Sequence, residues 1–114
     1  MTYNMLKDTP QRTAFLAMQE DRCAPRSKVE IPARLRISGR PAFGVTVRDL
    51  SLAGFSCDFP SAVPVGSRCW LKLPLIESLE AEVMWNDGMH LGCAFSNLLS
   101  PIVLDMLLRE FGQE

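Results

Sequence analysis

The alternation of hydrophobic and polar residues predicts most of the secondary structure of this 114-residue chain. From Val29 to Ile37 the two kinds alternate, as is typical of a β-strand with one buried and one solvent-facing side. A turn at Ser38–Pro41 precedes a second alternating segment at 43–47. Further turns separate the later predicted strands, which are 55–59, 67–74, 79–86 and 89–96. Six short strands at regular spacing predict a small antiparallel barrel, because closure removes exposed sheet edges.

Two helical segments flank the predicted strands. Thr9-Pro10 offers a capping hydroxyl and a proline at the first helical position, so residues 11–20 are predicted to form a short helix. Ser100-Pro101 opens a terminal helix, whose apolar residues recur at helical spacing: Val103, Leu104, Leu107, Leu108 and Phe111. The predicted fold is mainly β: residues 21–114 form a six-stranded antiparallel β-barrel with a C-terminal helix over one end, and residues 1–20 form an N-terminal extension with a short helix.

Length and charge limit the possible partners. The chain is long enough for one core, and its net charge of −1 gives no general basic field to hold DNA or RNA. It also lacks the basic and aromatic stripe of a nucleic-acid-binding barrel. Neither a charged-then-apolar leader nor a run of about 18 apolar residues is found, so the sequence predicts a cytoplasmic domain without membrane insertion.

The cysteine and histidine content argues against metal chemistry and catalysis. The four cysteines, Cys23, Cys57, Cys69 and Cys93, are widely spaced, and His90 is the single histidine, so we expect no metal site and no cofactor. Cys57, Cys69 and Cys93 lie in predicted strands and are interpreted as small core residues. Ser51 has no histidine base near it in the sequence and no nucleophile-elbow motif, so we expect no enzyme activity.

Two short strings carry the candidate chemistry. Arg22-Cys23-Ala24-Pro25-Arg26 precedes the first predicted strand, and Asp49-Leu50-Ser51-Leu52-Ala53-Gly54 forms the turn after the second. In an antiparallel pair, the start of the first strand and the end of the second lie at the same end of the sheet, so the strings are predicted to meet. Arginine binds phosphate bidentately and stacks on bases, and a carboxylate accepts from guanine edges, so a ligand with phosphates and guanines would suit them.

Structural interpretations of the same residues remain open. The arginine pair could be a solvated surface feature, and the second string an Asx-type turn in which Gly54 supplies a positive φ. Arg34, Arg36 and Arg48 fit the polar face of the first hairpin, with Glu30 or Asp58 as ion-pair partners. Other residues are assigned to barrel packing or surface cover (Trp70 and Trp85) or to an exposed strand position (His90).

The chain resembles the PilZ domain family, whose hallmark is Arg-x-x-x-Arg followed by Asp/Asn-x-Ser-x-x-Gly. Both strings are intact, and Arg26 precedes Asp49 by 23 positions. The segments Glu82–Trp85 and Leu91–Phe95 also resemble late strands of that family. The resemblance implies a six-stranded β-barrel that binds the bacterial second messenger cyclic di-GMP. By position, it assigns phosphate and guanine contacts to Arg22 and Arg26, guanine edges to Asp49 and Ser51, and close backbone approach to Gly54.

The expected function is therefore that of a second-messenger receptor. Ligand binding would order residues 21–28 against the barrel and change a surface read by an unidentified downstream protein. The alternative is a ligand-independent protein-protein interaction module, as found among degenerate members of the family. Asp21 departs from the arginine or aliphatic residue often seen before the first motif arginine, which leaves ligand stoichiometry and the choice between monomer and dimer open.

Overall fold

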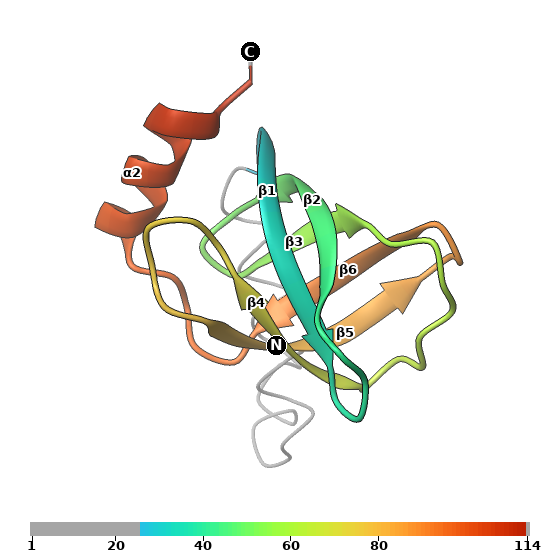
Figure 1. Ribbon diagram of the computed structural model, residues 1–114. Helices are drawn as coiled ribbons and strands as arrows, with labels where there is room; N and C mark the ends of the chain where they lie inside the picture. Colours follow the sequence, from blue (N-terminus) through green and yellow to red (C-terminus); the bar gives the residue numbers. More distant parts are fainter. Residues whose placement is uncertain (1–25, 114) are drawn as a thin grey trace, which may run out of the picture.

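A computed structural model of the chain describes residues 26–113 (Figure 1). The predicted six strands and C-terminal helix are confirmed among these residues. They are β1 (Ser27–Ile37), β2 (Phe43–Leu50), β3 (Gly54–Asp58), β4 (Arg68–Lys72), β5 (Leu79–Asn86), β6 (His90–Phe95) and α2 (Pro101–Phe111). The helix predicted at 11–20 lies outside the described residues, as do Asp21, Arg22 and Cys23.

The strands close into an antiparallel barrel in the order β1-β2-β3-β6-β5-β4. The first three strands pair in sequence order, and β4, β5 and β6 form a second meander. Two further pairs, β3 with β6 and β1 with β4, join these two meanders (Figure 1). Each of the six strands therefore has a partner on both sides, as the barrel prediction requires.

The barrel interior follows the alternation in the sequence. On β1, Ile31 and Leu35 are fully buried while Arg34 and Arg36 face outward. Other strands contribute further large buried side chains, namely Val47, Phe55, Leu71, Val83 and Leu91. Each such side chain stabilises the fold by roughly 1.5–3 kcal/mol relative to an exposed one, so this core is the main source of stability.

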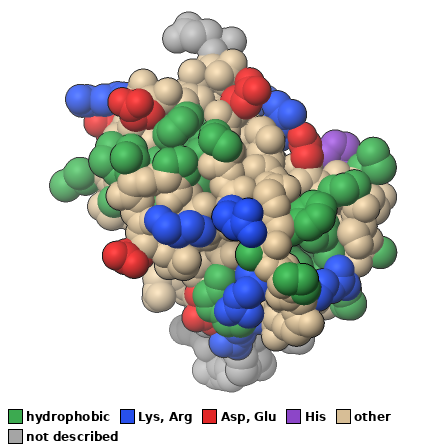
Figure 2. Space-filling model, in the orientation of Figure 1, with side chains coloured by type: hydrophobic (Ala, Val, Ile, Leu, Met, Phe, Trp, Pro, Cys, Tyr) green, Lys and Arg blue, Asp and Glu red, His purple; other side chains and the backbone are tan. Residues whose placement is uncertain are grey.

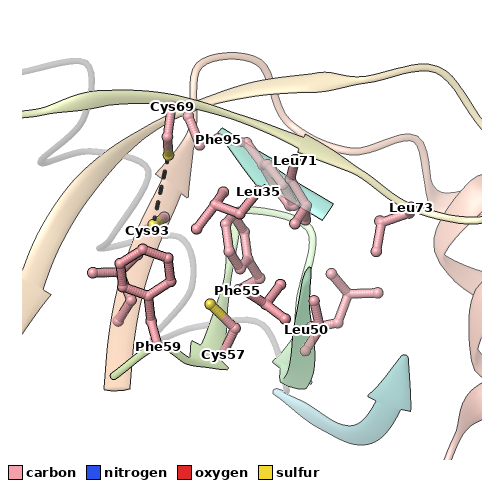
Figure 3. Packing of buried hydrophobic residues seen from close by; sticks show 14 of the residues in the cluster. Leu35, Leu50, Phe55, Cys57, Phe59, Cys69, Leu71, Leu73, Cys93 and Phe95 are labelled. Atoms are coloured by element: carbon pink, nitrogen blue, oxygen red, sulfur yellow. Dashed lines mark hydrogen bonds between the residues drawn. The ribbon is translucent and has the colours of Figure 1, made fainter. Parts of the chain in front are cut away.

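Three cysteines belong to this core, as predicted (Figure 3). Cys69 and Cys93 point toward one another with their sulfurs 3.9 Å apart, and Cys57 lies among the apolar side chains nearby. Burial raises the pKa of Cys57 to about 12, so its thiol stays neutral at physiological pH. These cysteines act as small apolar residues.

The terminal helix α2 packs against one end of the barrel (Figure 1). Ser100 caps it by accepting from the backbone N–H of Ile102 at 3.2 Å, Pro101 occupies the first turn, and Leu107 is fully buried. Beyond the helix, the N–H of Gln113 donates to the carbonyl of Lys28 at 2.9 Å. This bond ties the end of α2 to the start of β1, which pairs with the end of β2 at Asp49 and Leu50.

Candidate functional site

The start of β1 lies directly beside the end of β2. Ser27 pairs with Leu50, and Lys28 pairs with Asp49. This register places Arg26, the residue before β1, next to the second string. The prediction that the two strings lie at the same end of the sheet is thus confirmed for Arg26. The expectation that residues 21–28 become ordered only on ligand binding is wrong for Ser27 and Lys28, because these two residues already pair with β2.

Asp49 lies on the strand at the rim of the barrel, although alternation would place it inside. Val45 and Val47 face the core, but the register of β2 with β3 shifts between Val47 and Asp49, and Leu50 takes the next inward position. A β-bulge of this kind redirects the side chains that follow it. The Asp49 side chain therefore lies at the rim, where it is 19 % exposed and open to a partner.

Both oxygens of the Asp49 carboxylate have partners. The hydroxyl of Ser56 donates to Oδ2 at 2.7 Å, and Nζ of Lys28 lies 3.1 Å from Oδ1. Burial opposes ionisation of this group, but the bond from Ser56, the pairing with Lys28 and the charge of Arg26 together outweigh it and lower the pKa of Asp49. Asp49 is therefore a fixed, ionised hydrogen-bond acceptor at neutral pH.

Ser51 serves the turn itself. Its hydroxyl accepts from the backbone N–H groups of Ala53 and Gly54, each at 3.2 Å, and its own N–H donates to the Gly54 carbonyl at 3.0 Å. Only 1 % of the residue is exposed. These bonds are those of a serine-centred turn, so a direct contact between Ser51 and a ligand would require the turn to open.

Gly54 is required by a neighbouring strand. A Cβ at this position would lie 2.2 Å from the carbonyl oxygen of Cys93, because β3 pairs closely with β6 here. The interpretation that Gly54 supplies a positive φ is wrong: such angles occur in described glycines only at Gly39, Gly66 and Gly88. Gly54 instead permits a close backbone approach that anchors the turn to the barrel wall.

A pocket of about 400 Å³ opens beside Asp49. Its lining combines the motif residues Arg26 and Asp49 with an exposed aromatic residue, Trp85. The remaining lining residues come from the ends of β2, β3 and β6: Arg48, Ser56, Cys57, Asp58 and His90. The volume lies within the range of roughly 300–1,000 Å³ that is usual for small-molecule sites.

Trp85 was not predicted to belong to a site. By alternation with Ala81 and Val83 it should face the core, but the register of β5 with β6 shifts after Val83, and the residue is 38 % exposed. Its partner across the strands is Gly92, where a Cβ would fall 2.0 Å from the indole nitrogen. No signal in the sequence indicated this placement, because the pairing of Trp85 with Gly92 follows from the register shift after Val83.

Arg48 and Asp58 form an ion pair at the pocket wall, as one of the sequence interpretations allowed. Nε and Nη2 of Arg48 both contact Oδ2 of Asp58, at 2.9 and 2.8 Å. His90 is an exposed strand residue, as predicted, and its Nε2 lies 3.9 Å from the other Asp58 oxygen. The pocket thus brings together cationic, anionic and aromatic groups, a combination suited to a ligand that carries both phosphate and base.

Comparison with known proteins places this geometry in a family. The family model described as "PilZ domain" matches residues 20–111. The chain belongs to the PilZ domain family. Among solved structures, the PilZ domain with c-di-GMP of YcgR from Escherichia coli has a similar fold: its TM-score is 0.56 at 19 % identity, over 79 % of this chain and 88 % of that one. The comparison with curated proteins gave no match.

Residues 26–113 contain no group of three or more histidine, cysteine or acidic side chains placed to hold a metal ion. Within the same range, no helix is long and apolar enough to cross a membrane.

Proposed function

We propose that this PilZ domain is a receptor for cyclic di-GMP. The observation that carries the proposal is the convergence of Arg26, Asp49 and Trp85 on one pocket. The PilZ domain of YcgR, which has a similar fold, is described with this ligand. The proposed receptor acts in the bacterial cytoplasm.

The three residues have complementary roles in the proposed complex. The Asp49 carboxylate, held by Ser56 and ionised at neutral pH, accepts from the N1–H and the exocyclic amine of a guanine. Arg26 supplies paired donors to phosphate, and the exposed indole of Trp85 offers a flat surface for a base. Ser51 and Gly54 support these contacts by fixing the turn that joins Asp49 to β3.

Arg22 completes the proposed clamp from the segment before β1. Three residues lie between it and Arg26, so both guanidiniums could engage one ligand once the intervening chain is ordered. Ordering costs part of the binding energy, because side chains and backbone lose freedom. The moving part of the proposed receptor is this arginine segment, and the Asp49–Gly54 turn is the fixed part.

Isothermal titration calorimetry with the full chain tests the proposal directly. Arg26→Ala and Asp49→Ala should each weaken binding by one to two decades, since a charge-assisted contact contributes roughly 1.5–3 kcal/mol. Arg40→Ala, which removes an exposed arginine outside the pocket, is the matched control and should bind as the wild type does. Absence of binding heat in the wild-type chain would exclude a receptor role, and the fitted stoichiometry would show whether one ligand or a stacked pair binds.

The proposed receptor transmits the signal through a separate protein. A pull-down in the presence and absence of cyclic di-GMP tests this step: a receptor should capture its partner differently in the two conditions. Equal capture with and without the nucleotide, together with an absence of binding heat, would favour the ligand-independent interaction module instead.

A further inference from the structure

A second charged surface lies on the outside of β1 and β4, away from the residues that line the Asp49 pocket. We call it the β1–β4 basic face; its residues are Arg34, Arg36, Trp70 and Lys72. With Ala42 and Ser78 they line a hollow of about 320 Å³. Figure 2 shows lysine and arginine side chains gathered across the middle of the face that carries these two strands.

Two cations of this face lie opposite each other across the strand pair, and the third lies opposite a tryptophan. Arg34 is directly paired with Lys72, and Arg36 with Trp70. Like charges placed opposite each other in a sheet reduce stability, so the pairing of Arg34 with Lys72 does not stabilise the fold. The guanidinium of Arg36 lies 4.1 Å from the centre of the Trp70 ring, which holds this side chain in place by a cation–π contact.

Carboxylates do not neutralise the face. Among the ion pairs and hydrogen bonds of residues 26–113, none joins Arg34, Arg36 or Lys72 to an acidic side chain. The ammonium group of Lys72 instead donates to the backbone carbonyls of Leu73 and Ile76. Glu80, the neighbour of Trp70 on β5, is occupied by Arg68 at 2.7 Å.

We propose that the β1–β4 basic face binds a short, extended acidic segment of a partner protein. Arg34 and Arg36 lie two residues apart on one strand, so their Cα atoms are separated by about 7 Å, the spacing of alternate carboxylates in an extended peptide. Trp70 and Ala42 provide apolar contact beneath such a segment. A long nucleic acid fits less well, because the whole chain carries a net charge of −1 and Glu80 lies opposite Trp70 on the next strand.

Fluorescence anisotropy with a defined probe tests this proposal. The probe is a labelled peptide with glutamate at alternate positions and serine between them, and its uncharged counterpart carries glutamine in place of glutamate. The titration uses the full chain without cyclic di-GMP, so its result does not depend on the Asp49 pocket. The double variant Arg34→Glu/Arg36→Glu should lower the affinity for the glutamate peptide by about tenfold or more, because two favourable charge contacts become repulsive.

A charge-matched control separates local recognition from net charge. Arg40→Glu/Arg109→Glu makes the same change in net charge outside the hollow and should bind the peptide as the wild type does. Arg34→Gln/Arg36→Gln provides a second test with less perturbation and should also weaken binding. The proposal is overturned if the wild type does not bind the glutamate peptide, or if the glutamine peptide binds equally well. It is also overturned if the two charge-reversed variants behave alike, or if an oligothymidine of equal charge binds more tightly.

Discussion

The Asp49 pocket and the β1–β4 basic face differ in how their charged side chains are paired. In the pocket, Asp49 is held by Ser56 and Lys28, and Arg48 is paired with Asp58. On the basic face, Arg34 opposes Lys72 and neither has a carboxylate partner among the described residues. The pocket is therefore a preorganised site in which charges are paired with opposite charges, whereas the basic face keeps like charges opposite each other.

The largest difference in stability between the two regions should come from replacing a glycine near each of them with alanine. Gly54→Ala places a methyl group against the Cys93 carbonyl, and we expect it to lower the free energy of unfolding by about 3 kcal/mol because backbone must shift. Gly44→Ala is the matched control, because Gly44 lies on β2 opposite Arg34 and an added Cβ there would meet nothing within 4 Å. Urea unfolding measures both; equal effects would show that the turn is not closely packed.

Removal of the pocket carboxylate should have the next largest effect. Asp49→Ala leaves the buried Ser56 hydroxyl without its acceptor and removes the Lys28 pair, so we expect a loss of about 1–2 kcal/mol in the free energy of urea unfolding. Asp58→Ala breaks a more exposed pair and should cost less. A larger effect at Asp58 would contradict the view that Asp49 organises the site.

The pH dependence of stability should follow the same carboxylate. Because folding lowers the pKa of Asp49, its contribution is complete above the unfolded pKa of about 4 and is lost as the pH falls through the folded value. Asp49→Asn should therefore flatten the acid limb of a stability profile recorded by circular dichroism. A variant whose acid limb matches that of the wild type would show that Asp49 is not paired in solution.

Asp87 provides a second acid-sensitive position, at the β5–β6 turn beside the pocket. The backbone N–H of Met89 and then the side chain and N–H of His90 lower the pKa of Asp87 to about 2. Its stabilising effect should be present above about pH 4 and fade toward pH 2, in a small additional loss that Asp87→Asn reduces. Asp105→Asn, at an exposed pair on α2, serves as the control.

The smallest effects are expected on the basic face, and the two arginines of β1 should differ in sign. Arg34→Gln should raise the free energy of unfolding by about 0.3 kcal/mol, because it removes a like charge opposite Lys72. Arg36→Gln, two residues along the same strand, removes the contact with Trp70 and should lower stability by about 0.5 kcal/mol. Destabilisation by Arg34→Gln in low-salt urea unfolding would show that this face is not self-repelling.

Much of the architecture could be predicted because the spacing of hydrophobic residues along the sequence matches the side chains that are buried. The strand containing Ile31 and Leu35 and the Ser100-Pro101 helix start each follow from local chemistry. The pairing of the two ends of the first hairpin also follows, since antiparallel neighbours bring strand start and strand end together. These features require no knowledge of distant contacts.

The sequence by itself determined which residues form the core, the six strands and the motif positions Arg26 and Asp49. Only the tertiary structure decided that Asp49 and Trp85 face outward, because each follows a shift in strand register, after Val47 and after Val83. It also decided that Ser51 is enclosed by its turn and that Gly54 accommodates the Cys93 carbonyl. The physical reason is that alternation is a local property of one strand, whereas a bulge or a close backbone approach depends on the neighbouring strand.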